Sequence, residues 1–387
     1  MEEPVDMDIS LPEIPFYRIA PTENLMTPAL AIYMDAVESN IETTLALLGG
    51  KPERWRPHVK TAKLAAVMSR LTARGVRNFK CATTLELLTV CEAGARDVIV
   101  AYPTLGARAL RVQQIAHQFP DVDVSVLVES EEEIELWRGS PVSIFIDVNP
   151  GMNRTGLTQD SVGEIVRLAA RAQRAGLHFR GLHYYDGHHR DADLEQRKAA
   201  AYEGYDRLLQ IAEALRSVAT PVEEVITSGT PAFPCALTYP GFQTAAFKHT
   251  MSPGTVVYCD LDSLSQLPRE WGYRPAALVL TTVVSLPKPG IVTCDAGHKT
   301  VSADAGFPNC AVLGHPELTP QRPSEEHLPL SVAPGYSSPA RGATLYLVPK
   351  HVCPTVNNFD HAILVSHGQI TQATKVDARG RETPVLA

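Results

Sequence analysis

Eight short β-branched runs, most of them followed by an amphipathic helical stretch, make up most of residues 28–240. The runs are Leu30–Met34, Arg56–Lys60, Asn78–Ala82, Val98–Tyr102, Val122–Val128, Val142–Val148, Phe179–Tyr185 and Val222–Ser228. Strands that alternate with helices form parallel sheets, and eight such repeats predict a (β/α)8 barrel. A doubly wound open sheet is the alternative. The first run lacks the Gly-rich dinucleotide loop of such sheets, which favours the barrel.

The pattern changes after about Thr250. Prolines and glycines separate short apolar runs from there to the C-terminus, and no long helical period is present, which predicts a second, mostly β domain. A chain of 387 residues is also too long for one ordinary core. We therefore expect a barrel over residues 28–248, and a β domain built from residues 249–387 together with residues 1–27.

Composition narrows the class of protein. A net charge of -8 argues against a nucleic-acid surface, and 44% hydrophobic with 20% charged residues is typical of soluble globular proteins. Met1–Ile14 is acidic, unlike a signal or transit peptide, and no apolar run is long enough to span a bilayer. The seven cysteines have no compact spacing and fit free thiols. We expect a cytoplasmic protein with neither a nucleic-acid nor a membrane partner.

Two motifs lie where such barrels carry chemistry, at the ends of strands. Lys60 ends the second run. A lysine there is either solvated or partly desolvated, and a desolvated amine is what a Schiff base requires. Ser228-Gly229-Thr230 follows the eighth run, where backbone N–H groups and hydroxyls can bind phosphate. An ordinary turn is the alternative for this second motif.

His351-Val352-Cys353 carries two metal-binding side chains two residues apart. On an extended strand these side chains share one face, and imidazole with thiolate suits zinc or a neighbouring first-row metal. Two ligands leave open coordination positions, as in a catalytic site, although a chance His-x-Cys is the alternative. His188 and His327 are candidate acid–base groups, with solvated loops as the default interpretation, and His58 is a core histidine or one that supports Lys60.

Taken together, the motifs resemble the fold-type III pyridoxal-phosphate enzymes, the alanine racemase-like group, and within it the D-threonine aldolase and D-serine dehydratase branch. They occur in the family's order and span nearly the whole chain. The motifs are Arg56-Pro-His-Val-Lys60-Thr, Cys81-Ala-Thr-Thr-Leu-Glu86, Gly151-Met-Asn-Arg154-Thr-Gly156, Tyr185-Asp-Gly-His188, Ser228-Gly-Thr-Pro-Ala-Phe233, Ser252-Pro-Gly-Thr255, Asp295-Ala-Gly-His-Lys299, Ser324-Glu-Glu-His327 and His351-Val-Cys-Pro-Thr-Val-Asn357.

The resemblance implies a role for each residue. Lys60, next to His58, would form the internal aldimine with pyridoxal 5'-phosphate, Arg154 would face the cofactor's phenolic oxygen, and Tyr185 would line its ring. The phosphate would be held by Ser228, Gly229 and Thr230, with Tyr258 from the second domain. His351 and Cys353 would bind a divalent metal, zinc or manganese. Family members are homodimers with shared active sites, so the metal would act on the partner's cofactor or on its own.

The resemblance further implies a lyase that acts on D-3-hydroxy amino acids. The main reading is retro-aldol cleavage to glycine and an aldehyde, and the alternative is dehydration to a 2-oxo acid and ammonia. The loops at Tyr185 and Gly229 and the Pro-Thr-Val-Asn after Cys353 resemble the aldolases, whereas His-x-Cys itself matches the dehydratases. A racemase would need a second acid–base group, and a non-catalytic cofactor carrier lacks the C-terminal β domain, so both are less favoured.

Overall fold

A computed structural model describes residues 14–22 and 24–385 of the chain, which form two compact units. The barrel unit takes Leu45–Lys60, Met68–Gly254 and the described chain from Gly380 onward. The β unit takes the described chain up to Thr44, Thr61–Val67 and Thr255–Arg379. The acidic segment through residue 13, which we expect not to be a signal peptide, lies outside the described residues.

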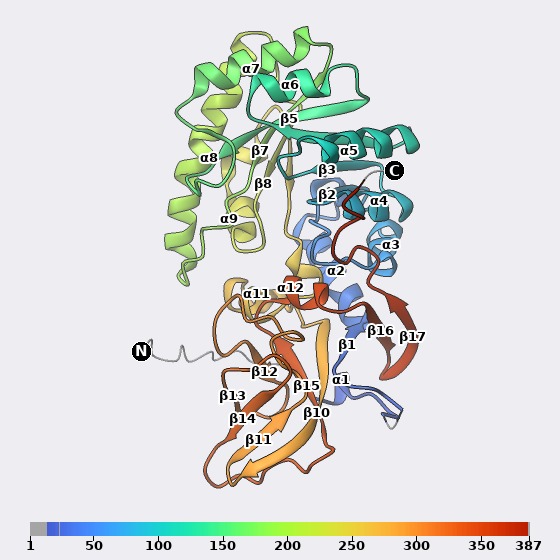
Figure 1. Cartoon of the computed structure of the whole chain (residues 1–387). Coiled ribbons are helices and arrows are strands. Elements are labelled where there is room, and N and C mark those ends of the chain that lie inside the picture. The colour runs from blue at the N-terminus through green and yellow to red at the C-terminus, as the bar shows by residue number, and fades with distance from the viewer. Residues whose placement is uncertain (1–13, 23, 386–387) are drawn as a thin grey trace. The chain divides into compact units, whose positions relative to one another are not determined.

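The barrel unit is built on a parallel sheet with helices on its outer side (Figure 1). In hydrogen-bonded order its strands are β2 (Asn78–Cys81), β3 (Asp97–Val100), β4 (Asp123–Val128), β5 (Val142–Asn149), β7 (His178–Tyr184), β8 (Glu224–Thr227) and β9 (Lys248–Met251), and the short β6 (Leu157–Thr158) pairs with β5. The segment 55–58 closes the sheet, because Trp55 bridges Met251 of β9 and His58 bridges Lys80 of β2, both in parallel. The predicted barrel is therefore confirmed.

Three helices of this unit begin where the sequence supplies a side-chain cap. The side chains of Thr83, Ser130 and Asp193 accept backbone N–H groups of the first turns of α4, α6 and α8, which satisfies donors that a helix start leaves unpaired. The helices are η1 (Pro52–Arg54), α4 (Thr84–Glu92), α5 (Ala107–Gln118), α6 (Glu131–Trp137), α7 (Val162–Arg174), α8 (Leu194–Ser217), α9 (Phe233–Thr238) and α10 (Pro240–Gln243), while α3 (Ala65–Ala73) crosses the boundary of the units.

The prediction for the first barrel strand is wrong. The run at Leu30–Met34 forms β1 (Ala29–Tyr33), which pairs antiparallel with β10 and parallel with β16 in the β unit. Its place in the barrel is taken by β9, which the sequence analysis assigned to the boundary with the second domain. A short, fully buried apolar run looks the same in either kind of sheet, whereas β9 begins with a lysine and a histidine and gives no apolar signal. The barrel sheet thus runs from Trp55 to Met251 rather than from residue 28.

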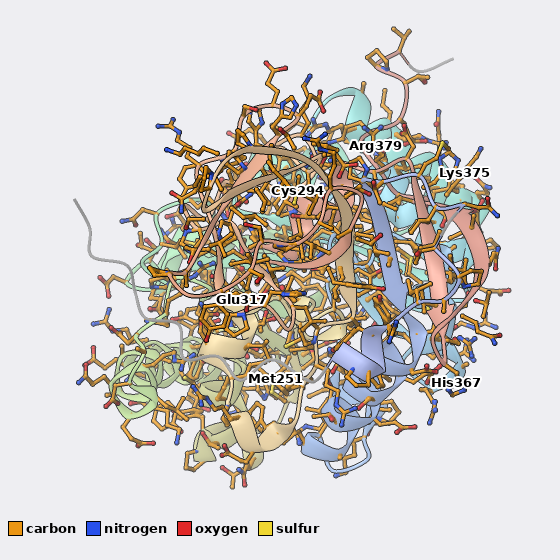
Figure 2. The ribbon with its side chains drawn as sticks, turned by 90° about the horizontal axis from the view of Figure 1, so that it is seen from below. Met251, Cys294, Glu317, His367, Lys375 and Arg379 are labelled. Atoms are coloured by element: carbon orange, nitrogen blue, oxygen red, sulfur yellow. The ribbon has the colours of Figure 1, made fainter. Side chains whose placement is uncertain are left out.

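The β unit contains a mixed, mostly antiparallel sheet in the order β13-β14-β11-β10-β1-β16-β17, with β15 joining β10 to β12. Its core includes Cys294, labelled in Figure 2, whereas His367 and Lys375 lie at the exposed β16–β17 edge. The strands besides β1 are β10 (Ala277–Lys288), β11 (Ile291–Cys294), β12 (Cys310–Val312), β13 (Leu318–Pro320), β14 (Leu328–Val332), β15 (Thr344–Pro349), β16 (His361–Ser366) and β17 (Gln369–Lys375). The helices are α1 (Ile14–Tyr17), α2 (Met34–Leu47, which continues into the barrel unit), η2 (Thr255–Val257), α11 (Leu261–Gln266), η3 (Arg269–Trp271) and α12 (Val352–Asn357).

The described part of the N-terminal segment packs within the β unit. The Tyr17 hydroxyl donates to the Pro275 carbonyl at 2.8 Å, and the Ile19 N–H donates to the Tyr346 hydroxyl at 3.2 Å. All seven cysteines are free, and all but Cys353 are buried. Among residues 14–22 and 24–385, no helix is long and apolar enough to cross a membrane.

Candidate active site

Lys60 stands at the end of the segment that closes the barrel. It is half-buried, and its backbone N–H donates to Nδ1 of His58 at 3.2 Å. The loop after β9 passes close by: a Cβ on Gly254 would lie 2.5 Å from the His58 carbonyl oxygen, so only glycine permits this approach. His58 therefore supports the backbone that carries Lys60.

Tyr185 is the centre of the predicted cofactor site. It follows β7, and its ring packs on Gly187 and Gly229, where a Cβ on Gly229 would lie 2.9 Å from the ring carbon Cε2. Gly229 is therefore needed for the space that it leaves to Tyr185. The sequence analysis assigned this glycine to phosphate binding or to an ordinary turn, and not to this contact.

Three basic side chains surround the Tyr185 ring. Nζ of Lys60 lies 5.8 Å from the ring centroid, Nζ of Lys80 5.0 Å and Cζ of Arg154 4.9 Å. The loop that carries Arg154 is held by Asn149, whose Oδ1 accepts the N–H groups of Gly151 and Asn153. The fold thus brings Lys60, Arg154 and Tyr185 together at one end of the barrel, as the sequence analysis required.

The loops after β8 and β9 present hydroxyl groups. Ser228, Thr230 and Ser252 are buried, and among the described residues their side-chain oxygens have no hydrogen-bond partner. The Ser252 N–H donates to the Thr227 carbonyl at 3.0 Å, so the two loops lie side by side. Ser228 has a φ of 58°, a strained conformation for a residue with a side chain. Unpaired buried hydroxyls next to Gly229 are what a phosphate group would satisfy.

The barrel interior next to this site holds a polar cluster that sequence reasoning missed. His183 Nδ1 lies 2.6 Å from Asp147 Oδ1, and within the described residues its Nε2 has no partner. Burial and the charge of Lys80 lower the pKa of His183 to about 4, so its imidazole is neutral at neutral pH. The signal for Lys80 was a lysine inside the short predicted strand Asn78–Ala82.

The predicted metal pair lies in the β unit on a different element from the one we expected. His351 is the N-cap of α12 and Cys353 lies in its first turn, so the prediction of an extended strand is wrong. Apolar Val352 between them is equally compatible with a strand. Burial opposes protonation of the His351 imidazole, but hydrogen bonds to Cys353 and Asp304 and the charge of Cys353 raise its pKa to about 10.

Polar groups surround this pair. Nδ1 of His351 lies 2.6 Å from Asp304 Oδ2, and Sγ of Cys353 lies 3.0 Å from the Thr61 hydroxyl and 3.8 Å from that of Thr255. In the described part of the chain, no three His, Cys, Asp or Glu side chains are grouped closely enough to hold a metal ion. A metal here would therefore have His351 and Cys353 as protein ligands and keep open positions.

The remaining predicted residues are more scattered. His188 is exposed after β7, its ring centroid lies 4.1 Å from that of His189, and partial burial lowers its pKa. His327 is exposed in the β unit before β14. The hydroxyl of Tyr258 is buried and donates to the Ala62 carbonyl at 2.8 Å, and its contact with the cofactor's phosphate stays a prediction.

Comparison with known proteins agrees with this geometry. The model of the alanine racemase N-terminal domain family matches residues 32–261, which is more than half of the chain. The chain belongs to this family. The family's fold is that of the fold-type III pyridoxal-phosphate enzymes, and a serine dehydratase domain model matches residues 276–365 of the β unit.

Relatives that resemble this chain along most of its length are lyases. A D-threonine aldolase of Arthrobacter sp. is 28% identical, with 98% of this chain and 99% of the relative covered. A D-threo-3-hydroxyaspartate dehydratase of Delftia sp. is 25% identical over 87% of this chain and 93% of the relative. Among solved structures, the D-threonine aldolase of Filomicrobium marinum has a TM-score of 0.83 and 28% identity, with 92% of this chain and 96% of that one covered.

Proposed function

We propose that this chain is a pyridoxal-phosphate- and divalent-metal-dependent lyase that cleaves D-3-hydroxy amino acids of the D-threonine type to glycine and an aldehyde. The observation that carries the proposal is the set of buried, unpaired hydroxyls of Ser228, Thr230 and Ser252 at the end of the barrel that also bears Lys60. The D-threonine aldolase relative spans 98% of the chain, β unit included, and supports the choice of reaction.

The barrel unit would hold the cofactor. When bound, pyridoxal phosphate supplies an electron sink for charge at the substrate's Cα, and a divalent metal supplies a Lewis acid for its β-hydroxyl. The amine of Lys60 would bind the cofactor's aldehyde, Tyr185 would line the ring, and the guanidinium of Arg154 would face the phenolic oxygen. The cofactor's phosphate would be bound by the hydroxyls of Ser228, Thr230 and Ser252 and by Gly229.

The β unit would hold the metal through Nε2 of His351 and Sγ of Cys353. Asp304 contacts the other ring nitrogen of His351 and so fixes the ring for ligation. A thiolate ligand favours zinc over manganese.

A base must take the proton of the substrate's β-hydroxyl before the Cα–Cβ bond breaks. The lowered pKa of His188, which its partial burial causes, leaves the imidazole uncharged at neutral pH, and a base needs that form. His188 is thus the candidate of the barrel unit, and His327 is the candidate of the β unit.

Dehydration is the second candidate function. Cys353 favours it, because the His-x-Cys pattern matches the dehydratases of the family, and one relative is a D-threo-3-hydroxyaspartate dehydratase. In that reaction Lys60 would remove the Cα proton and the β-hydroxyl would leave. The same side chains serve both reactions, so the products must decide between them.

Product analysis tests the proposal. The protein is incubated with pyridoxal phosphate, a divalent metal and D-threonine, with L-threonine as the control. We expect glycine and acetaldehyde from the D-isomer alone. 2-Oxobutanoate and ammonia would establish the dehydratase, and formation of L-allo-threonine, the product of inversion at Cα alone, would establish a racemase. An unchanged cofactor spectrum with every D-amino acid would indicate a carrier. The predicted cytoplasmic location and homodimer with shared active sites belong to the same proposal.

A further inference from the structure

Lys80 is a second lysine at the site that we propose for the cofactor. It lies on β2, directly beside His58 of the closing segment, and the bridge between these two residues fixes its register. Its Nζ lies 5.0 Å from the Tyr185 ring centroid, nearer than the 5.8 Å of Lys60. Only 3% of Lys80 is exposed, so its amine is directed into the barrel rather than to solvent.

The surroundings of Lys80 favour an uncharged amine. Burial, followed by the charges of Lys60 and Arg154, lowers its pKa to about 7, although Asp147 and Asp186 oppose the shift. Both carboxylates already have partners: Asp147 faces His183 at 2.6 Å, and Asp186 accepts the Tyr205 hydroxyl at 2.5 Å. Burial, the largest cause, and the charge of Arg154 both remain when Lys60 is removed, and a buried amine beside another cation is a recognised way to make a lysine nucleophilic.

We propose that Lys80 is a second imine-forming amine of this site, able to hold the aldehyde of pyridoxal phosphate covalently when Lys60 is removed. The inference rests on the proposed function, because it requires the cofactor aldehyde at this end of the barrel. The nitrogen lone pair of Lys80 forms a C–N bond to the aldehyde carbon, the C–O bond breaks, and the oxygen leaves as water. No oxidant or reductant is needed.

Lys63 is the matched control. It is closer to Lys60 in sequence, but its Nζ donates to the Ala378 carbonyl at 3.1 Å within the β unit. It also has a φ of 53°, which fixes its backbone in a turn. Sequence proximity therefore favours Lys63 as the substitute amine, whereas the structure favours Lys80.

Borohydride trapping of the full-length protein tests this inference. Wild type, Lys60→Ala, Lys60→Ala/Lys80→Met and Lys60→Ala/Lys63→Met are each mixed with pyridoxal phosphate at about pH 8, where ordinary lysines with a pKa near 10.4 remain protonated. Reduction fixes any imine, and peptide mass spectrometry locates it. We expect label on Lys60 in wild type and on Lys80 in Lys60→Ala and Lys60→Ala/Lys63→Met. We expect no specific label in Lys60→Ala/Lys80→Met.

Two failures are distinguishable. A wild type without label on Lys60 refutes the proposed cofactor role of that residue. Label on Lys60 in wild type, combined with no label in Lys60→Ala or label on Lys63, refutes the role of Lys80 alone. If Lys60→Ala/Lys80→Met does not fold, as judged by circular dichroism, Lys60→Ala/Lys80→Arg replaces it. Arginine keeps a basic side chain at this position but forms no stable imine. Persistent specific label in the Arg variant would also overturn the inference.

Discussion

The carboxylate of Asp304 contacts Nδ1 of His351, a proposed metal ligand. This 2.6 Å contact leaves Nε2 as the ligand and fixes the orientation of the ring. We predict that Asp304→Asn weakens metal binding about 10–100-fold, the usual effect of removing such a partner. Competition with a chromophoric chelator measures this affinity, and the cofactor's absorption spectrum should not change.

Glu317→Gln is the control for this substitution. Oε1 of Glu317 lies 2.9 Å from Nδ1 of His315 in the same unit, and neither residue of this histidine–carboxylate pair is a proposed metal ligand. We expect no change in metal affinity for this variant. Equal loss in both variants would show that general weakening of the β unit, and not His351, is the cause.

Among the elements of the barrel unit, ion pairs hold the closing segment, residues 55–58, to the sheet. Arg56 is fully buried, and its guanidinium binds Asp97 of β3 at 2.7 Å and Glu224 of β8 at 2.9 Å. Arg180 of β7 binds the same two carboxylates. Asp97 and Glu224 are the first residues of their strands, so this network lies at the end of the barrel opposite the candidate site, where stability rather than catalysis is expected.

We predict that Asp97→Asn lowers the free energy of unfolding by about 3–5 kcal/mol, because it leaves two buried arginines short of an anion. Urea denaturation measures the change. Asp160, exposed and 3.9 Å from Arg207, is the control, and Asp160→Asn should leave the midpoint unchanged. A similar shift in both variants would contradict a specific role of the network.

The carboxylate of Asp97 also makes the stability of the protein depend on pH in the acid range. Burial alone would raise the pKa of Asp97, but Arg56 and Arg180 lower it well below its ordinary value. A lowered folded-state pKa stabilises the protein at a pH above the unfolded pKa, near 3.9, and this stabilisation is lost as the pH falls. The Asp97→Asn variant should therefore lose less stability than wild type when both are acidified below about pH 4.

Strands whose own residues form an apolar run could be predicted from the sequence. The sheet that a strand joins, or a strand that forms only because of its neighbours, could not. The runs at β4, β5 and β7 are buried along most of their length and were placed within one or two residues. β1 was assigned to the wrong sheet because nothing in five apolar residues tells whether the neighbouring strand is parallel or antiparallel. β9 was missed because the barrel, and not its own sequence, makes it a strand.

For the whole molecule, the ordered motifs located the candidate site and the fold supplied what surrounds it. Lys60, Arg154 and Tyr185 could be named in advance because motifs that resemble the family carry them near the ends of predicted strands. Lys80 and Asp304 could not, because their positions depend on the closure of the barrel and on a turn that has no pattern of its own. Side chains that change the pKa or the orientation of site residues often come from such segments.

The last prediction concerns the assembly that the family resemblance implies, a homodimer with shared active sites. Lys60→Ala and Cys353→Ala are each expected to be inactive alone. If each site combines Lys60 of one subunit with Cys353 of the other, their heterodimers keep one intact site, and co-expression should restore about a quarter of wild-type activity. Wild type co-expressed with the double variant is the reciprocal control, since its heterodimers would have no intact site. Active heterodimers in the reciprocal pair, with none in the first, would place cofactor and metal of each site on one subunit.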